Sequence, residues 1–440
     1  MGHTAWIVTV DMGYGHQRAA YPLRRLSPTG KVIVANNYQG IPKRDYRLWN
    51  NGRRVYEFFS RMSNLPVFGG LIFGMLDKFQ EIKPFYPHRN LTAPNVQVKQ
   101  TYSLIRRGLG KDLVKLLATD DIPLITTFFT VAFLAEEHGF KQDIYLVVCD
   151  ADVSRTWAPL NPSKSRIKYL APCHRVVERL KLYGIREENI FLTGFPIPEE
   201  NLGDNLTVLQ ADVAERLINL DPEERYRRKY AETVKQFVKG IKIDARHHHP
   251  LTITFAVGGA GAQKKIAADI LKSLKKKLIA KEINLNLVAG SRNDVYAYFK
   301  SLIESAGLGK RLGENLNILF ALDKEDYFKN FNEALRTTDV LWTKPSELVF
   351  YSALGLPIIM APSLGSQEVF NRLWLKTIGA GISQNDPRYA NEWLFDWVNS
   401  GWLAEAAMSG YLDGRQFGVR NIMDVVFHGI KEPTLDDSLL

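Results

Sequence analysis

The sequence has two cysteines in 440 residues, Cys149 and Cys173. So few cysteines provide no disulfide framework and indicate a reducing compartment. There is no Cys-x-x-Cys pair, so a zinc site built on cysteine is not expected. The histidines at 247–249 lie in a connector, and three consecutive side chains do not converge naturally on one ion, so we expect no metal site.

Long apolar runs are also absent. No stretch approaches the about 20 residues that a membrane-spanning helix needs. The first apolar run, "AWIVTV", has the length of a strand, and no basic region precedes it, so no signal peptide is expected. With 45% hydrophobic and 24% charged residues, the composition is that of a soluble globular protein with room for two domains.

Negative charge is scarce in one part of the chain. The formal net charge is +10, and residues 41–110 alone hold twelve Lys and Arg against four Asp and Glu, a local net of +8. Such an excess favours an anionic partner, which could be lipid, nucleic acid or a polyanionic substrate. The alternative is a solvated basic face without a partner.

Strand-like runs alternate with helical patterns in two separate series, which predicts βαβ units and parallel sheets. We predict an α/β fold of two doubly wound Rossmann-like domains that face each other across a cleft. The expected parts are an N-terminal domain over 1–196, a charged helical connector over 197–250, a second domain over 251–385 and C-terminal helices over 386–440. Ligands of such sheets bind at the carboxyl ends of the strands.

The first of these strand ends reads "DMGYGH". Gly13 and Gly15 allow the close approach of a ligand, and His16 follows in the first turn of the next helix. The positive end of the helix dipole favours the neutral form of a histidine, which can act as a base. The alternative is a histidine that only caps or packs.

A second strand end, "VVCDADVSRTW", places Asp150 at the carboxyl edge of the same predicted sheet. A carboxylate there could take a proton from an acceptor hydroxyl. An aspartate that only caps a turn explains the position equally well.

The second domain contains the Gly-rich turn "FAVGGAGAQ", with Gly258, Gly259 and Gly261 after a strand and Gln263 near the start of a helix. Glycines and a helix N-terminus suit a diphosphate. No Gly-Lys-Ser/Thr follows, and the full Gly-x-Gly-x-x-Gly pattern is absent, so an empty βα turn is an equal alternative.

The richest stretch is "TKPSELVFYSALGLPIIMAPSLGSQEVFN". Lys344 ends a strand, and Gln367, Glu368 and Asn371 cluster later. Amide and carboxylate groups beside a phosphate site suit the hydroxyls of a sugar. A polar helix cap explains any one of the three, but all three together less well.

Taken together, "DMGYGH", the Asp150–Trp157 stretch, the Gly-rich turn, "GSRN" and "TKP…AL.GLP…QE..N" resemble a known family. The chain is similar to GT-B glycosyltransferases of the monogalactosyl-diacylglycerol synthase and processive diacylglycerol glucosyltransferase type. The peptidoglycan lipid-intermediate GlcNAc transferase is a more distant relative.

The resemblance implies an inverting hexosyl transfer from a UDP-sugar to a membrane lipid acceptor, without a cofactor or catalytic metal. It places His16 on the acceptor side, with His16 or Asp150 as the catalytic base, and Gln367, Glu368 and Asn371 at the donor sugar. It implies that Phe320 and Ala321 read the base. The implied nucleotide and diphosphate residues are Gly13, Gly15, Gly258, Gly259, Gly261, Gln263, Arg292, Asn293, Phe320, Ala321, Lys344 and Glu347.

Three positions depart from the family pattern. Ser346 and Glu347 replace a Gly-Gly pair, Ser352 replaces the glutamate that binds ribose, and Ser154 replaces a histidine. We expect Glu347 to take over the ribose contact. Two alternatives therefore remain: another nucleotide-sugar enzyme, such as a UDP-GlcNAc 2-epimerase, or a GT-B-derived binding protein that has lost catalysis.

Residues 53–79 mix arginines with aromatic and aliphatic side chains. Such a segment can lie in a bilayer interface with its cations at anionic headgroups; a core helix with a basic outer face is the alternative. We expect a cytoplasmic protein, peripheral on the inner face of the membrane, and no nucleic-acid partner, because no base-reading motif is present.

Overall fold

The computed structural model describes residues 3–51, 82–87, 89–238, 249–256, 263–363 and 365–430. The Gly-rich turn at 258–261, the basic segment 53–79, His247 and His248 lie outside the described residues. In the part that is described, no helix is long and apolar enough to cross a bilayer.

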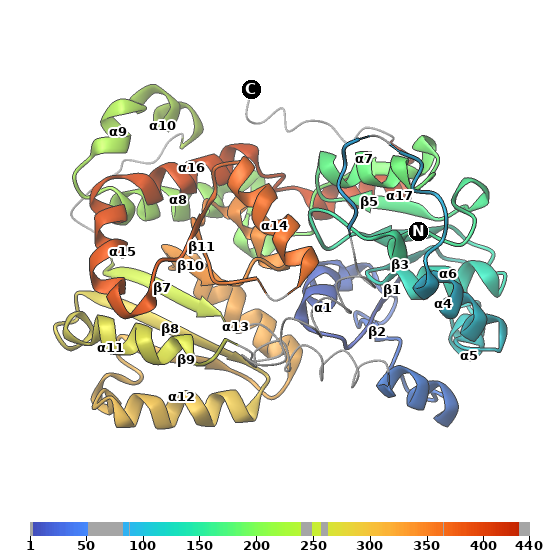
Figure 1. The fold of residues 1–440 in the computed structure, drawn as a ribbon, viewed down its shortest axis with the longest axis horizontal. Helices are drawn as coiled ribbons and strands as arrows, with labels where there is room; N and C mark the ends of the chain where they lie inside the picture. Colours follow the sequence, from blue (N-terminus) through green and yellow to red (C-terminus); the bar gives the residue numbers. More distant parts are fainter. Residues whose placement is uncertain are drawn as a thin grey trace. The chain divides into compact units, whose positions relative to one another are not determined.

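The chain forms two compact units. Unit 1 comprises Met1–Ile197, Leu364–Asn371 and Arg415–Asp437; unit 2 comprises Pro198–Ser363, Arg372–Gly414 and Ser438–Leu440. Each unit contains one six-stranded sheet, and every strand pairing is parallel (Figure 1). The predicted fold class, two doubly wound Rossmann-like domains, is confirmed; that they face each other across a cleft stays a prediction.

The sheet of unit 1 has the strand order β2-β1-β3-β4-β5-β6. The direction of progress reverses between β1 and β3, and this is the switch point at which doubly wound sheets bind ligands. The strands are β1 Trp6–Thr9, β2 Ile33–Val34, β3 Leu124–Thr126, β4 Ile144–Val147, β5 Lys168–Ala171 and β6 Ile190–Leu192. The main helices are α1 Tyr14–Ala20, α4 Val96–Arg106, α5 Lys111–Leu117, α6 Phe129–Glu137, α7 His174–Leu182 and α17 Gly418–His428.

The sheet of unit 2 has the order β12-β11-β10-β7-β8-β9, which matches the dinucleotide-binding order, with its switch point between β7 and β10. The strands are β7 Leu251–Ala256, β8 Ile283–Gly290, β9 Leu316–Phe320, β10 Val340–Thr343, β11 Ile358–Met360 and β12 Gly381–Ser383. The helices that follow them are α11 Ile266–Ile279, α12 Asn293–Ser305, α13 Lys324–Arg336, η8 Glu347–Leu354, α14 Ser366–Thr377, α15 Ala390–Asn399 and α16 Trp402–Asp413.

Parallel strands need helical crossovers, and right-handed crossovers decide which face each helix covers. The helices α11 and α12 pack side by side against β8 on one face (Figure 1). The β9-to-β10 crossover runs in the opposite direction along the sheet, so α13 covers the other face. The predicted helix "ELVFYSALG" is the 3₁₀ helix η8, which ends at Leu354 and is capped by Gly355 with φ 67°.

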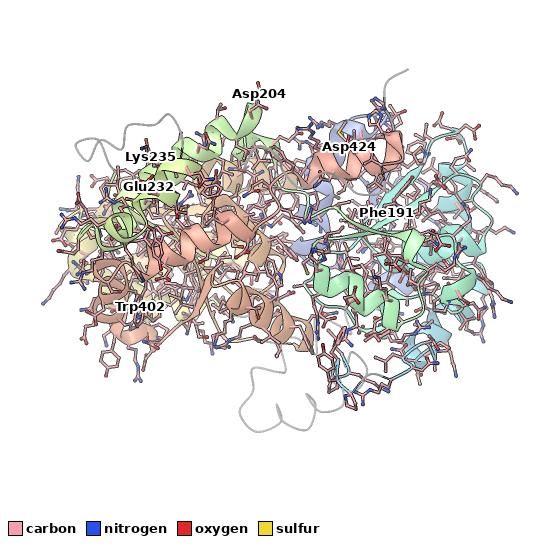
Figure 2. The ribbon with its side chains drawn as sticks, turned by 90° about the horizontal axis from the view of Figure 1, so that it is seen from above. Phe191, Asp204, Glu232, Lys235, Trp402 and Asp424 are labelled. Carbon is pink, nitrogen blue, oxygen red and sulfur yellow. The ribbon has the colours of Figure 1, made fainter. Side chains whose placement is uncertain are left out.

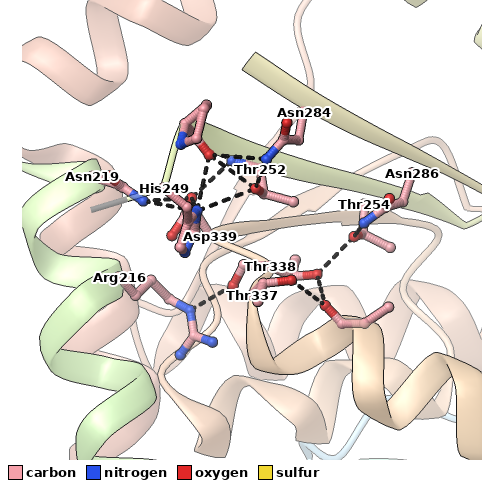
Figure 3. A network of polar contacts seen from close by, with 12 residues as sticks. Arg216, Asn219, His249, Thr252, Thr254, Asn284, Asn286, Thr337, Thr338 and Asp339 are labelled. Carbon is pink, nitrogen blue, oxygen red and sulfur yellow. Dashed lines mark hydrogen bonds and ion pairs between the residues drawn. The ribbon is translucent and has the colours of Figure 1, made fainter. Parts of the chain in front are cut away.

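The described residues 198–238 of the predicted connector belong to unit 2 and contain α8 Thr207–Leu220, α9 Arg225–Lys229 and α10 Ala231–Phe237. Arg216 joins α8 to the rest of the unit, because its guanidinium donates to the carbonyl of Thr338 at 2.7 Å (Figure 3). It also donates to the carbonyl of Leu354 at 2.7 Å. Figure 2 labels Glu232 and Lys235 on α10 and, elsewhere on unit 2, Trp402 on α16.

Asp339, which precedes β10, sits at the centre of this network (Figure 3). Its Oδ2 accepts hydrogen bonds from Thr252 N at 2.8 Å and Asn219 Nδ2 at 3.0 Å, and His249 Nδ1 lies 3.7 Å away. Its Oδ1 is buried with no hydrogen-bond partner among the described residues. Burial raises the pKa of Asp339 from 3.8 to about 7, against the opposing effects of His249, Arg216 and the hydrogen bonds.

We predict that Asp339→Asn removes one component of the pH dependence of stability. The pKa of Asp339 is higher in the folded than in the unfolded chain, so the folded state binds the extra proton between pH 3.8 and about 7. Stability from this group therefore falls as pH rises through that window, by at most about 1.4 kcal/mol per pH unit. The free energy of unfolding of both proteins, measured by urea denaturation across this range, should differ by a slope of that sign; parallel curves would contradict the prediction.

Candidate functional site

The turn between β1 and α1 needs glycine at its last residue, Gly13. Gly13 caps α1 with φ 101° and ψ 171°, a backbone conformation that side-chain-bearing residues rarely adopt. A Cβ at Gly13 would meet no atom within 4 Å, so the requirement comes from the backbone and not from crowding. Gly15 follows inside α1, and His16 is the third residue of that helix, within its first turn as predicted.

His16 is held by the chain that follows β3. Its Nδ1 lies 2.7 Å from the carbonyl oxygen of Thr127. A carbonyl oxygen only accepts hydrogen bonds, so Nδ1 carries the proton and the lone pair of the neutral ring is on Nε2. Phe128 meets the ring edge-on at 5.0 Å, and the ring of Trp157 lies at 6.1 Å. This arrangement selects the tautomer in which Nε2 can accept a proton.

Polar side chains also hold the turn that leads to His16. Asn36, after β2, accepts from the backbone N–H of Asp11 at 2.8 Å and donates to its carbonyl at 3.3 Å. Gln17 Nε2 donates to Asp11 Oδ1 and to Gly13 O, both at 3.1 Å. The start of α1 is thus tied to the neighbouring strand end.

Asp150 lies after β4, which neighbours β3 in the sheet. Its Oδ1 accepts a hydrogen bond from Asn371 Nδ2 at 2.9 Å, and Asn371 Oδ1 accepts from Ala151 N at 2.7 Å. Asn371 is fully buried. Because the Ala151 N–H fixes which side of the amide is oxygen, the Asn371 amino group must point at Asp150. Asn371 therefore positions Asp150; that it also binds sugar stays a prediction.

The second aspartate of "CDAD" has a different role. Arg179 donates to Asp152 through two nitrogens, at 2.7 and 3.0 Å, and Arg175 adds a third contact at 2.9 Å. Asp152 is 1% exposed and the Arg179 side chain 0%. A buried bidentate pair of this kind orients α7 against the sheet, so Asp152 is a structural residue.

In unit 2, Gln263 lies two residues after Gly261, the last glycine of the predicted diphosphate turn. Its side chain is 5% exposed, and Nε2 donates to Pro362 O at 2.6 Å. Its Oε1 is buried and has no hydrogen-bond partner among the described residues. Gln263 thus links the start of α11 to the loop after β11, two loops at the carboxyl edge of one sheet. The diphosphate glycines themselves lie outside the described residues.

Glu347 and Ser352, two of the positions after β10 that depart from the family pattern, lie in different surroundings. Lys344 directly follows β10, and Glu347 begins η8 with only 9% of its surface exposed. Ser352 is fully buried, and its Cβ would lie 2.9 Å from a Cβ built on Gly410 of α16. The position that the resemblance equates with the ribose glutamate therefore faces a helix in the core of unit 2, whereas Glu347 is at the carboxyl edge.

The remaining predicted nucleotide residues also follow strands of the second sheet. Arg292 and Asn293 come after β8, and Arg292 pairs with Asp294 through nitrogens at 2.9 and 3.0 Å. This pairing lowers the pKa of Asp294. Phe320, at the end of β9, stacks on Tyr296 at 4.7 Å, and Ala321 N donates to Gly290 O at 3.1 Å. These residues share one sheet edge.

Of the predicted residues that the structure describes, Gly13, Gly15, His16 and Asp150 follow strands of the first sheet, and Arg292, Asn293, Phe320, Ala321, Lys344 and Glu347 lie at the ends of strands of the second. Gln367, Glu368 and Asn371 open α14 and belong to unit 1, although their sequence position lies within the predicted second domain. The sequence did not identify Thr127, whose carbonyl holds His16, or Asn36, whose amide holds Asp11. The only signal in the sequence is that each residue directly follows an apolar run, "PLIT" for Thr127 and "KVIVA" for Asn36.

Over the described ranges, no group of three or more His, Cys, Asp or Glu side chains could hold a metal ion. Burial raises the pKa of the Cys173 thiol to about 12, so this cysteine is not a reactive thiolate.

Comparisons with solved structures find similarity of the fold over nearly the whole chain. No protein-family model and no curated protein matches the sequence. The structure resembles Acinetobacter baumannii MurG (TM-score 0.45, 16% identity, 96% of this chain and 99% of that one). It also resembles the S. aureus MnaA–UDP co-structure, with a TM-score of 0.48 and 14% identity over 97% of this chain and 98% of that one. A glycosyltransferase from Rickettsia africae ESF-5 has a TM-score of 0.40 and 12% identity over 97% of this chain and 99% of that one. At these scores the similarities say nothing about substrates.

We predict that Asn371→Leu destabilises unit 1. The substitution leaves the buried N–H of Ala151 without its acceptor and removes a donor from Asp150, and such a loss costs about 1–3 kcal/mol. Urea denaturation followed by circular dichroism measures the loss.

Asn371→Asp is the matched variant, because it keeps an acceptor for Ala151 but sets a carboxylate against Asp150. It should be less stable than the parent at pH 7, with a gap that narrows on acidification as one carboxyl becomes protonated. Two variants as stable as the parent would mean that the Asn371 contacts contribute nothing.

Proposed function

We propose that this protein is an inverting GT-B glycosyltransferase that moves a sugar from a UDP-sugar to the hydroxyl of a membrane lipid. The observation that carries the proposal is the hydrogen bond between His16 Nδ1 and Thr127 O. It leaves Nε2 as the basic nitrogen of a half-buried imidazole at the switch point of the first sheet.

In the proposed reaction, the acceptor hydroxyl attacks the anomeric carbon of the donor from the face opposite the nucleotide. Nε2 of His16 takes the hydroxyl proton while the new glycosidic bond forms. The bond to UDP breaks, and the diphosphate leaves with the bonding electrons. The configuration at the anomeric carbon is therefore inverted, and the Thr127 carbonyl stabilises the imidazolium through Nδ1.

The second unit is proposed to hold the donor. Its strand order is that of nucleotide-binding sheets, and its Gly-rich sequence follows β7 at the switch point. Gln263, Lys344 and Glu347 come from three positions on that edge. Glu347 is proposed to bind the ribose hydroxyls, because Ser352 faces the core.

The lipid class of the acceptor rests on the resemblance, with the 53–79 segment as the proposed contact to an anionic membrane surface. Inner-face peripheral attachment follows from the same proposal.

We predict that His16→Asn lowers kcat by a factor of about 10² to 10⁴, the usual contribution of a general base. Asparagine can keep a donor to Thr127 O but has no basic nitrogen. The dissociation constant for UDP should stay unchanged, because the proposal places His16 at the acceptor hydroxyl and the donor on unit 2. Transfer from radiolabelled UDP-sugars to extracted lipids measures kcat, and Asp150→Asn is the comparison variant. A larger loss in Asp150→Asn than in His16→Asn would make Asp150 the base.

We predict that the protein binds UDP in preference to ADP, GDP and TDP, as measured by calorimetry.

We also predict that Glu347→Ala raises the dissociation constant for UDP about tenfold, because the hydrogen bonds to the ribose are lost. Unchanged affinity in Glu347→Ala would remove Glu347 from the site.

The same assays separate the alternatives. A new soluble nucleotide sugar formed without lipid would identify an epimerase. Nucleotide binding without any product, or no nucleotide binding at all, would favour a binding protein that has lost catalysis.

A further inference from the structure

Trp157 carries a buried hydrogen-bond donor that lacks an acceptor in the described part of the chain. The residue ends the 3₁₀ helix η2, Arg155–Trp157, and is 1% exposed. Its Nε1–H is buried and has no hydrogen-bond partner there. An indole nitrogen only donates, and a buried donor without an acceptor costs about 1–3 kcal/mol. A ligand that supplies the acceptor is one physical reason for keeping such a group.

Elsewhere in the chain, buried indole N–H groups have acceptors. Trp6, Trp342 and Trp393 expose at most 8% of their surface. Their Nε1 atoms donate to Leu117 O at 2.8 Å, Gln384 Oε1 at 2.8 Å and Asp386 O at 2.9 Å, respectively. Trp157 is as deeply buried as these residues, so the lack of an acceptor sets it apart from them.

The ring of Trp157 lies beside the candidate base. Its centroid is 6.1 Å from that of His16 and 5.4 Å from that of Phe129. The three residues follow the strands β4, β1 and β3, respectively, and so lie at the carboxyl edge of the first sheet. The indole is therefore next to the place where the proposed reaction puts the acceptor hydroxyl.

Hydrogen bonds fix the backbone that carries this indole. Trp157 O accepts from Tyr169 OH at 2.9 Å. Arg155, at the start of η2, donates to Thr92 O through two nitrogens at 2.7 and 3.0 Å. The position of the indole is thus set by the fold before a substrate binds.

We propose that the Trp157 Nε1–H binds an ester carbonyl oxygen of the lipid acceptor, next to the hydroxyl that His16 deprotonates. This inference rests on the proposed function, and it adds the residue and the chemical feature by which the acceptor is selected. Trp157 takes no part in proton transfer. It is a specificity-determining residue that favours lipids with an ester beside the free hydroxyl.

The chemistry of the indole favours this kind of oxygen. Phosphate oxygens are bound best by charged donors, whereas the indole N–H is neutral and its ring contacts are with His16 and Phe129. The reacting hydroxyl needs its own lone pair for the attack on the anomeric carbon, which leaves a neighbouring carbonyl as the acceptor. In a diacylglycerol, four atoms separate the hydroxyl oxygen from the nearest ester carbonyl oxygen. This reach is comparable to the 6.1 Å between the two ring centroids.

The test compares sugar transfer to a diacylglycerol and to its dialkyl ether, which keeps the hydroxyl and lacks both carbonyls. Both lipids are presented in the same nonionic micelles with radiolabelled UDP-sugars. The parent should prefer the ester in kcat/KM by about five- to tenfold, the contribution of one hydrogen bond. Trp157→Phe keeps an aromatic ring without the N–H, so it should lose this preference. Benzothienylalanine at position 157, which has sulfur in place of the N–H and nearly the same shape, should lose it too, and it serves if the smaller Phe disturbs folding.

Trp49→Phe is the matched control. Trp49 also lies near His16, because its ring is 6.2 Å from that of Phe128, but its indole nitrogen is not among the buried groups without a partner. This variant should keep the ester preference, whatever its effect on the rate.

The outcomes separate this inference from the proposed function. A parent that transfers sugar equally well to both lipids overturns the inference alone. So does a benzothienylalanine variant that keeps the ester preference or loses transfer to both lipids equally. If the parent transfers sugar to neither lipid, the proposed function fails and the inference fails with it.

Discussion

The parallel pairing of β1 with β3 is the constraint on which the candidate base depends. The register sets Val8 opposite Thr126, and the next residue, Thr127, donates its N–H to Val8 O at 3.1 Å. A hydrogen bond of 2.8 Å between the hydroxyls of Thr9 and Thr127 continues the contact beyond the strands. These bonds hold the Thr127 carbonyl beside the first turn of α1. The tautomer of His16 is therefore set by a residue 111 positions away in the chain.

Buried polar groups are distributed differently in the two units. In unit 1, Asp152 and Arg179 form an ion pair just beyond the strand end that carries Asp150, so this turn is bonded to α7. In unit 2, Arg216 and Asp339 lie at the amino ends of β7 and β10, where they tie α8 to the sheet (Figure 3). The carboxyl edge of unit 2 is thus left to the loops that are proposed to hold the donor.

Two residues show where position in a motif and position in space diverge. The resemblance equates Ser352 with a ribose-binding residue, but in the structure η8 turns Ser352 toward Gly410 in the core of unit 2. Asn371 belongs to a polar cluster that resembles a sugar site, yet both ends of its amide are bonded to the Asp150–Ala151 turn. The direction of a side chain depends on the type of helix and on the residues packed around it. The spacing of a motif predicts neither.

The sequence by itself determined the fold class, the two series of strands and the ends of the strands at which polar residues gather. Apolar runs of strand length alternate with helical periods, and this local pattern is sufficient for a parallel α/β sheet. Only the tertiary structure decided that Thr127 holds His16, that Asn371 holds Asp150 and that Asp152 is structural. These roles come from contacts between segments far apart in the chain, made through backbone carbonyls and amides that no single stretch of sequence reveals.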